Sequence, residues 1–414
     1  MSARIQAPRG TSDVLEEAAL ARTHLEGVAR DILERAGYHR IETPTFEATE
    51  LFARGVGEST DVVQKEMYTF AEADGTSYAL RPEGTAPICR AYLEHGMHKL
   101  PQPVKLWYLS SFFRRERPQK GRYRQFWQVG AEAIGSDDPA VDAEAILLLA
   151  ELYEAMGCRG VRLRLGSLGS PETRRAYRVQ LQAFLRAHAD ALAPEVVARI
   201  DLNPLRAFDA DHPGTRRVMQ DAPRLLDALA DDDREHFAAV RALLAAAGLA
   251  YEIDPTLVRG LDYYTRTVFE FTSDALGAQS GIGGGGRYDG LIEQIGGPAT
   301  PGIGWASGIE RILMTATAAP AAAPPVDLFV AYATPSRRAS AFRLAADVRR
   351  AGHAARVELG GRSLKGQLRQ ADRAGARFVA ILGDEGTSLK DMETGEQRTV
   401  EAATVMHHIT HGWL

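Results

Sequence analysis

The hydrophobic pattern at the start of the chain is helical. Between residues 16 and 36, apolar side chains recur at helical intervals among charged ones, and Gly37 follows. This spacing predicts an amphipathic helix that ends at the glycine. Further helices are expected from about Thr85 and over 142–156, and Ser170–Pro171 has the residue types that favour a helix start.

Alternation of apolar and polar residues predicts strands in the middle of the chain. Residues 103–116 and 122–135 have strand-like composition and flank a charged turn, so two strands joined by a hairpin are expected. Residues 161–169 predict another strand, and strand patterns return over 251–283. A long stretch of different composition separates these two groups of strands.

The chain divides by composition into several parts. Residues 171–250 are rich in Ala, Leu, Arg and Asp with helical periodicity, which predicts a mostly helical insertion. Residues 315–326, TATAAPAAAPPV, suit an extended linker because such a composition cannot bury a core. Strand and helix patterns then alternate, so a small α/β domain with a largely parallel sheet is expected. The expected boundaries are 1–170 and 251–316 for the two parts of one domain, 171–250 for the insertion, 317–325 for the linker and 326–414 for the α/β domain.

One predicted strand begins in an unusual way. Residues 257–271, LVRGLDYYTRTVFEF, alternate as a half-buried strand only in their second half. The first half gathers Arg259, Tyr263, Tyr264 and Arg266 with an aspartate around one glycine. A strand end at the surface with solvated charges explains this composition, and so does the wall of a pocket for a small polar ligand.

The densest group of basic residues lies in the predicted hairpin, between 114 and 124. A solvated turn explains some of them, but their number and the aromatic-rich strands beside them favour a phosphate site, because guanidinium groups bind phosphate oxygens in pairs. The basic residues are Arg114, Arg115, Arg117, Lys120, Arg122 and Arg124. Glu116 lies among them and either balances their charge or binds a cationic group or a metal.

Three shorter motifs each allow two explanations. Residues 283–290, GGGGRYDG, form either a flexible loop or a backbone that approaches a ligand closely, with Tyr288 following. The run matches neither the P-loop nor the dinucleotide-binding pattern. Glu83 in RPEGTAP satisfies a helix terminus or receives an ammonium group. Arg311 in GIERIL is either a surface partner of a nearby acid or points into a pocket.

Composition limits the classes of protein to which these motifs can belong. The chain has 414 residues, 45% hydrophobic and 25% charged, which is typical of a soluble globular protein with two or three domains. Its net charge of −5 gives no global basic field, so nucleic-acid binding must rest on local patches. Cys89 and Cys158 lack metal-ligand spacing, which argues against a zinc site. Without an apolar leader or a long apolar run, a cytoplasmic protein with no membrane partner is expected.

The longer motifs, taken in order, resemble a known family. GYHRIETPTFEATELF, FFRRERPQKGRYRQFWQVGAE and GIGWASGIERIL resemble motifs 1, 2 and 3 of the class II aminoacyl-tRNA synthetases. RGLDYYTRTVFEF and GGGGRYDGL resemble the two histidine-specific signatures of the histidyl-tRNA synthetase family, and APRGTSDV, RPEGTA and KEMYTF fit the same family. The resemblance runs from about Ile5 to the end of the sequence. It departs from the family at Trp305, where Phe is more usual, and in the short connection 384–391.

The resemblance implies a fold and a reaction. The implied fold is an α+β class II synthetase catalytic domain, an antiparallel sheet flanked by helices, with a helical insertion and a following small α/β anticodon-binding domain. The implied reaction joins L-histidine and ATP into histidyl-adenylate, releases pyrophosphate, and then transfers histidine to the 3′ end of tRNA(His). ATP and Mg²⁺ are the implied cofactors, and motif 1 implies a homodimer.

The resemblance also assigns roles to single residues. Arg259 and Arg114 are the implied catalytic residues, in contact with the α-phosphate and the histidine carboxylate. The implied histidine-binding residues are Glu83, Thr85, Arg114, Gln128, Glu132, Arg259, Tyr263, Tyr264 and Tyr288. The implied ATP-binding residues are Arg114, Glu116, Arg122, Phe126 and Arg311. The hairpin tip is left to meet the acceptor end of the tRNA, which carries an extra 5′ guanine in this family, through Arg117, Gln119 and Lys120.

Three other functions share part of this pattern. The synthetase-like regulatory subunit of ATP phosphoribosyltransferase has this fold, but it typically loses the RGLDYY segment and the C-terminal domain, both of which are present here. A ligase that makes a free amide should lack an anticodon domain after a linker. A simple RNA-binding module has no need of Glu83, Gln128 and Glu132.

Overall fold

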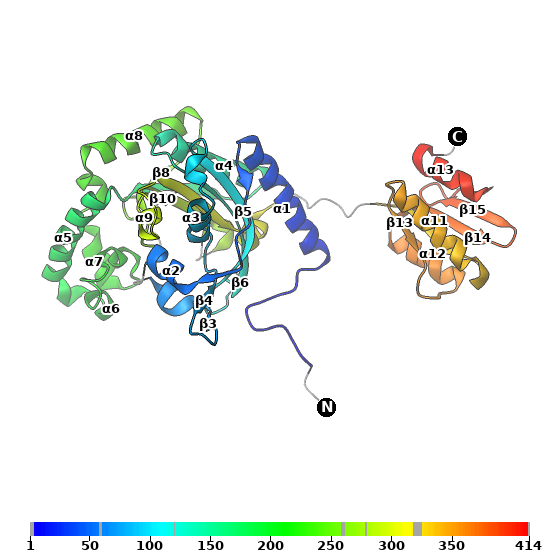
Figure 1. The fold of residues 1–414 in the computed structure, drawn as a ribbon, viewed down its shortest axis with the longest axis horizontal. Helices are drawn as coiled ribbons and strands as arrows, with labels where there is room; N and C mark the ends of the chain where they lie inside the picture. The colour runs from blue at the N-terminus through cyan, green and yellow to red at the C-terminus, as the bar shows by residue number, and fades with distance from the viewer. Residues whose placement is uncertain are drawn as a thin grey trace. The chain divides into compact units, whose positions relative to one another are not determined.

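The chain forms two compact units, Met1–Pro320 and Ala321–Leu414. The structure is a computed structural model that describes residues 4–57, 60–119, 121–257, 261–277, 280–317 and 325–412. Each unit is built on a β-sheet with helices packed on its faces (Figure 1). Among the helices in these ranges, none has the length and apolar character needed to cross a membrane.

The first unit is built on a sheet that has eight strands within the described residues. Their order is β1 (His39–Arg40), β5 (Val104–Phe113), β6 (Gln125–Ile134), β11 (Gly302–Gly308), β10 (Gly281–Arg287), β9 (Thr265–Ser273), β7 (Val161–Ser167) and β8 (Glu252–Ile253). Neighbouring strands from β5 to β7 are antiparallel, and β1 and β8 pair in parallel at the two edges. The predicted hairpin is confirmed as β5 and β6, and the sheet is the antiparallel one that was expected.

Helices cover one face of this sheet with a continuous apolar core. These helices are α1 (Glu16–Arg35), α4 (Pro139–Ala155), α8 (Asp231–Ala246) and α10 (Ile309–Thr315). Alternation along β6 places Val129, Ala131 and Ala133 in this core. Gln128 and Glu132 alternate with them in sequence and therefore belong to the opposite face, which carries α2 (Thr49–Val56), α3 (Thr85–Glu94) and α9 (Leu291–Gln294).

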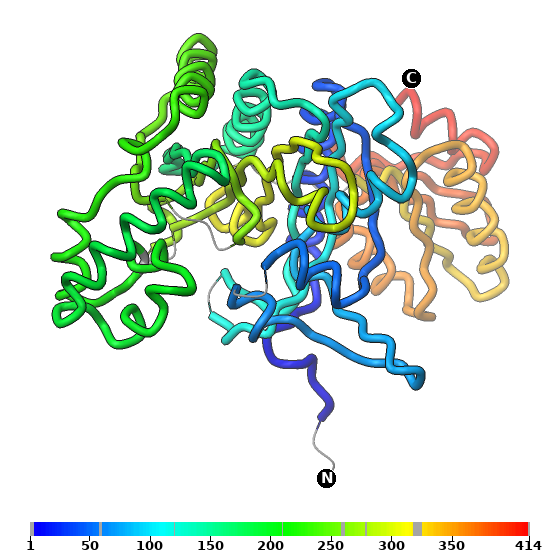
Figure 2. The backbone as a smooth tube through the Cα atoms, turned by 60° about the vertical axis from the view of Figure 1, so that its left-hand side comes forward, coloured from blue at the N-terminus to red at the C-terminus, as the bar shows by residue number. Residues whose placement is uncertain are grey.

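A helical segment separates β7 from β8 in the sequence, although the two strands are neighbours in the sheet. Its helices α5 (Pro171–Ala187), α6 (Pro194–Val197) and α7 (Pro213–Gln220) group beside the sheet, and α8 packs against α4 (Figures 1 and 2). The predicted helix start is confirmed, because the Ser170 hydroxyl accepts a hydrogen bond from the Thr173 amide at 3.2 Å and Pro171 is the first helical residue.

A small sheet near the start of the chain carries exposed aromatic residues. It consists of β2 (Phe46–Ala48), β4 (Ser77–Leu80) and β3 (Thr69–Ala71) in antiparallel order. The rings of Phe46, Phe70 and Tyr78 lie 5.6 to 5.9 Å apart and form what we call the aromatic cluster. Phe46 is 48% exposed and Phe70 is 45% exposed, so this cluster is an apolar patch on the surface of the unit.

The second unit corrects one prediction from the sequence. Its sheet has the order β13 (Ala355–Val357), β12 (Val326–Tyr332), β14 (Ala376–Gly383), β15 (Gly386–Asp391) and β16 (Gln397–Val400). The three strands predicted from the sequence, β12, β13 and β14, are parallel as expected, but β15 pairs antiparallel with both β14 and β16, so the expectation of a largely parallel sheet is corrected to a mixed sheet. The segment taken as a short connection at 384–391 contains the turn and strand β15. Helices α11 (Arg338–Arg350), α12 (Leu364–Arg373) and α13 (Val405–His411) pack on the sheet.

Candidate active site

A cavity of about 620 Å³ opens on the face of the first unit's sheet to which Gln128 belongs. The hairpin of β5 and β6, the strands β10 and β11 and the start of α10 all contribute to its lining, and we call it the central cavity. The predicted site residues in that lining are Arg114, Glu116, Arg122, Phe126, Gln128, Tyr264 and Arg311. Segments that are distant in the sequence therefore converge on one cavity.

A buried hydrogen-bonded group of predicted residues adjoins this cavity. The Glu132 carboxylate accepts hydrogen bonds from the Thr85 hydroxyl at 2.8 Å and from the Tyr288 hydroxyl at 2.7 Å. The Glu83 carboxylate accepts from the Thr85 amide at 2.8 Å and from the Tyr263 hydroxyl at 3.5 Å. We call these five residues the carboxylate cluster; all of them are buried.

The α3 terminus explains why Glu83 can lie in such a place. Its carboxylate also accepts from the Ala86 amide at 3.0 Å, so it satisfies the first backbone donors of the helix. The interpretation of Glu83 as a partner of a helix terminus therefore holds. Its burial beside Glu132 nevertheless leaves open a second role toward a bound cation.

The two carboxyl groups of the cluster influence each other. Burial raises the pKa of Glu132 to about 8, and the charge of Glu83 adds to this effect against the hydrogen bonds from Tyr288 and Thr85. Burial also raises the pKa of Glu83, while the Ala86 and Thr85 amides and the charge of Arg114 lower it. Such a site favours a ligand that brings positive charge and several N–H donors, because either would offset the cost of ionising two buried acids.

Glycines on the neighbouring strands make room for these polar side chains. A Cβ atom on Gly304 of β11 would lie 1.6 Å from the Glu132 carboxylate oxygen Oε2. A Cβ atom on Gly302 would lie 2.4 Å from the Tyr288 ring. The glycine-rich strands are thus needed to pack the carboxylate cluster against the sheet. The run 283–290 is largely strand β10, so the expectation of a flexible loop is wrong, whereas Gly283 and Gly284 line the central cavity, which fits a close approach of the backbone to a ligand.

Tyrosine and glutamine side chains connect the cluster to the central cavity. The rings of Tyr263 and Tyr264 lie 4.7 Å apart, and those of Tyr263 and Tyr288 lie 6.0 Å apart. Tyr264 and Gln128 also line the cavity. The buried Oε1 of Gln128 has no hydrogen-bond partner within the described residues, so it is a candidate acceptor for a ligand N–H.

The outer part of the cavity is basic. The Arg114 guanidinium lies over the Phe126 ring, 5.3 Å from its centroid, and donates from Nε to the Pro82 carbonyl oxygen at 2.9 Å. Glu116 forms an ion pair with Arg122 at 3.2 Å. Arg311 donates from Nε to the Gly281 carbonyl oxygen at 2.6 Å. These arginines come from two elements, and their charges suit a polyphosphate.

The remaining predicted residues form two pairs. Arg259 and Lys120 fall outside the described residues. Arg117 and Gln119 are exposed on the hairpin, where the Gln119 and Arg122 backbones exchange hydrogen bonds at 3.2 and 2.9 Å. The structure therefore brings the residues predicted for histidine and ATP together, apart from Arg259, and leaves the described residues predicted for tRNA on the surface.

Other residues at the site had not been predicted from the sequence. Tyr108 of β5 has a buried hydroxyl without a hydrogen-bond partner in the described part of the chain, and a Cβ atom on Gly130 would lie 2.3 Å from its ring. Glu270 of β9 lines the central cavity, and its charge within an apolar strand was a usable signal. Arg206, from the helical segment, also lines the cavity, and no local pattern marks it.

The residues of the cavity fit a magnesium ion that is bound mainly through substrate phosphates. The described residues contain no group of three or more His, Cys, Asp or Glu side chains arranged to hold a metal. Single carboxylates, such as Glu116 and Glu270, do line the cavity. This matches Mg²⁺ bound through one or two carboxylates together with substrate phosphates and water.

Comparison with known proteins places both units in described families. Residues 10–312 match the family Histidyl-tRNA synthetase, and residues 327–411 match the family Anticodon binding domain. The chain is 48% identical to Histidine–tRNA ligase of Rubrobacter xylanophilus over 408 residues, which covers 95% of this chain and 96% of the relative. It is similar to the crystal structure of apo S. aureus histidyl-tRNA synthetase, with a TM-score of 0.83, 34% identity, and coverage of 98% and 100%.

A more distant structure shares only the fold. It is described as an ATP phosphoribosyltransferase regulatory subunit/histidyl-tRNA synthetase from Bacillus halodurans. Its TM-score is 0.66 at 21% identity, and the match covers 92% of this chain and 99% of that one.

The antiparallel sheet, the basic hairpin and the buried polar cluster beside them are those of a class II aminoacyl-tRNA synthetase. Within that class, the match over most of the first unit and the identity with full-length relatives settle the family. The chain belongs to the histidyl-tRNA synthetase family.

Proposed function

We propose that this chain is a histidine–tRNA ligase: it activates L-histidine with ATP and then attaches histidine to the 3′ end of tRNA(His). The observation that carries this proposal is the carboxylate cluster, in which Glu132 and Glu83 are buried with three hydroxyl-bearing residues. The cluster adjoins a cavity lined by arginines, so an amino acid and a nucleotide can meet there. The relatives named Histidine–tRNA ligase support the same activity.

Recognition of histidine follows from the chemistry of imidazole. An imidazole ring offers at least one N–H donor, and its second nitrogen accepts or donates according to its protonation. We assign Glu132 and a tyrosine hydroxyl to the two ring nitrogens, with Tyr263, Tyr264 and Tyr288 forming the walls. Glu83 and Thr85 receive the α-ammonium group, and Gln128 accepts from a further N–H. An amino acid lacking these nitrogens leaves buried polar groups unpaired, a mismatch worth ~10⁴–10⁵ in discrimination.

The first chemical step joins two anionic groups. A histidine carboxylate oxygen attacks the α-phosphorus of ATP, an acyl–phosphate bond forms, and the bond to pyrophosphate breaks. We assign Arg114 and Arg259 to the carboxylate and the α-phosphate, where their charge stabilises the transition state. Arg122 and Arg311 hold the outer phosphates, and Phe126 and Arg311 flank the adenine. Glu116 orients the nucleotide, and Mg²⁺, when bound, would supply positive charge beside the phosphates.

The second step uses the tRNA. The terminal ribose hydroxyl attacks the histidyl carbonyl carbon, an ester bond forms, and AMP leaves with the electrons of the broken bond. We assign Arg117, Gln119 and Lys120 to the acceptor end of the tRNA and the second unit to the anticodon, consistent with its family. The protein acts in the cytoplasm.

The proposed protein is a homodimer. The aromatic cluster of the small sheet supports this, because Phe46 and Phe70 are both nearly half exposed and lie together. Phe46 belongs to the segment that resembles motif 1, which forms a dimer interface in this class. Burial of the cluster by a second copy would remove its apolar surface from water.

Histidine-dependent exchange of labelled pyrophosphate into ATP, followed by charging of tRNA, tests the function. We expect exchange with histidine and no exchange with other amino acids, and histidine attached to tRNA(His). Exchange without attachment would favour an enzyme that makes only the adenylate. Absence of both would favour a regulatory role, as the fold shared with the Bacillus halodurans protein allows.

A further inference from the structure

The helical segment contacts the backbone that carries the pocket tyrosines. Arg174 on the first turn of α5 donates from Nη1 to the carbonyl oxygen of Tyr264 at 2.6 Å and lies 3.5 Å from that of Asp262. These two carbonyl groups flank Tyr263 on either side in the chain. One guanidinium group therefore holds the backbone before and after a residue of the carboxylate cluster.

Apart from a hydrogen bond from the Asp262 amide to the Val56 carbonyl oxygen at 3.3 Å, this backbone has little regular support. Residues 261–264 precede β9 and belong to no helix or strand, so they lack the ladder hydrogen bonds that begin at Thr265. The far end is tied where the Thr265 hydroxyl donates to the Asp289 carboxylate at 3.3 Å, next to Tyr288. Between these points, Arg174 supplies a charge-assisted hydrogen bond, which is stronger than a neutral one.

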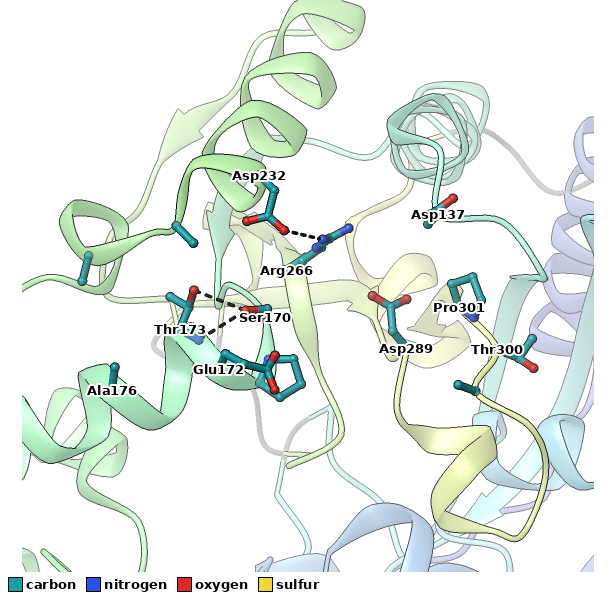
Figure 3. A pocket seen from close by; sticks show the side chains of 14 residues that line it. Asp137, Ser170, Glu172, Thr173, Ala176, Asp232, Arg266, Asp289, Thr300 and Pro301 are labelled. Carbon is teal, nitrogen blue, oxygen red and sulfur yellow. Dashed lines mark hydrogen bonds and ion pairs between the residues drawn. The ribbon is translucent and has the colours of Figure 1, made fainter.

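The start of α5, where Arg174 lies, is itself fixed to the sheet. The Asp233 carboxylate of α8 accepts from the Ser170 amide and from the Thr173 hydroxyl, both at 2.8 Å. Its other oxygen accepts from Nε of Arg266 in β9 at 3.0 Å. Figure 3 shows Arg266 near the start of α5, beside Ser170 and Thr173. The same few residues thus connect α5, α8 and β9.

We propose that Arg174 is a positioning residue for the histidine pocket, through which the helical segment sets the placement of Tyr263 and Tyr264. The inference rests on the proposed function. Within the described residues, the side-chain hydrogen bonds of Arg174 reach the lining of the central cavity only at the Tyr264 backbone, so its effect on the ligand is indirect. Loss of its donor leaves the Tyr264 carbonyl group without this partner and frees the segment to move. The tyrosine rings, which pack on one another, then lose their common placement.

The test compares Arg174→Met with Arg175→Met. Arg175 is the neighbouring residue, its side chain is 74% exposed, and it pairs with Glu172 on the surface of the same helix. The histidine dissociation constant is measured by calorimetry without ATP, and the Michaelis constants for histidine and ATP are measured in the exchange reaction. We expect Arg174→Met to weaken histidine binding on the order of tenfold or more, as loss of a charged hydrogen bond does. The ATP constant should change much less, and Arg175→Met should match the parent.

Two further variants separate positioning from folding. Arg174→Lys keeps a charged donor and should recover much of the histidine affinity. If Arg174→Met does not fold by circular dichroism, Arg174→Gln is measured in its place. A folded variant without the charged donor that binds histidine as the parent does would overturn the inference, and so would equal losses for histidine and ATP. If the parent protein binds no histidine, the proposed function itself fails. If the parent binds histidine and the Arg174 variant binds it equally well, only the role of Arg174 fails.

Discussion

At the residue scale, Glu132 is fully buried and takes its hydrogen bonds from the hydroxyl groups of Thr85 and Tyr288. We predict that Glu132→Gln raises the Michaelis constant for histidine about tenfold to a hundredfold, because a carboxyl group that can ionise against a bound N–H donor is replaced by an amide that cannot. The constant for ATP should stay close to that of the parent. Pyrophosphate exchange at varied histidine and ATP measures both. A change confined to ATP would move Glu132 to the nucleotide site.

The same residue makes stability depend on pH. Burial raises the pKa of Glu132 from 4.5 to about 8, so between these values the folded protein holds a proton that the unfolded chain has released. The free energy of unfolding therefore falls as pH rises through this interval. We predict that, without substrates, the melting temperature of the parent declines more from pH ~5 to ~8 than that of Glu132→Gln. Glu293→Gln, at an exposed position, should follow the parent. Parallel curves for parent and Glu132→Gln would contradict this.

At the scale of elements, the sequence predicted strands and helices well where one face is apolar. The hairpin β5–β6 and the start of α5 follow from alternation and from the Ser-Pro cap. The sequence did not predict that β10 is a strand, because a run of glycines shows no alternation. The reason for glycines in these strands appears only in the structure, where Glu132 and Tyr288 pack against β11. The antiparallel β15 was missed because a short polar strand looks like a loop.

The site shows a similar limit. Arg287 and Tyr288 are neighbours in one motif, yet Arg287 is buried in an ion pair with Asp142 of α4 at 2.7 Å, while Tyr288 donates to Glu132. The local sequence pattern cannot show which of two adjacent polar residues faces a ligand. That depends on which elements pack against each face of the sheet. The residues of the carboxylate cluster come from separate parts of the chain. Before the structure, only the resemblance of the ordered motifs to the family indicated that they lie together.

The exposed hairpin tip makes a separate prediction. Arg117 and Gln119 are exposed, and their side chains can pair with base edges. We predict that Arg117→Ala or Gln119→Ala slows histidyl transfer but spares pyrophosphate exchange. The variants should also distinguish less than the parent between tRNA(His) with and without its extra 5′ guanine. Arg35→Ala, at a position 78% exposed on α1, serves as a control. Equal discrimination by variants and parent would place this recognition elsewhere.

The small sheet makes a prediction about assembly. If a second copy covers the aromatic cluster, Phe46→Ser with Phe70→Ser should shift the protein from dimer to monomer, because two polar groups replace buried rings. Sedimentation at several protein concentrations measures the shift. Phe342→Ser, 56% exposed on the second unit, should leave the dimer intact. A dimer that survives loss of both rings would place the interface elsewhere.

At the scale of the whole molecule, the chain divides into two compact units, to which the proposed function gives different tasks. We predict that a chain ending near residue 318 keeps histidine-dependent pyrophosphate exchange, because the central cavity and the carboxylate cluster belong wholly to the first unit. Its charging of tRNA should fall strongly, since the second unit, which matches the anticodon-binding family, is absent. Exchange and charging by the shortened and full chains give the comparison. Full charging by the shortened chain would remove the anticodon role.

The order of strands in the larger sheet also governs how the protein is made. β6 pairs with β5 early in the chain, but its second neighbour is β11, and Gln128 meets Gly308 only after the helical segment has been synthesised. At roughly 5–20 residues per second, a ribosome leaves this strand edge open for many seconds. Contacts within the helical segment are local and form quickly, whereas the sheet must wait for its last strands. The nascent chain therefore emerges with an unpaired edge beside its future active site, and until β11 is made this edge is open to pairing with other chains.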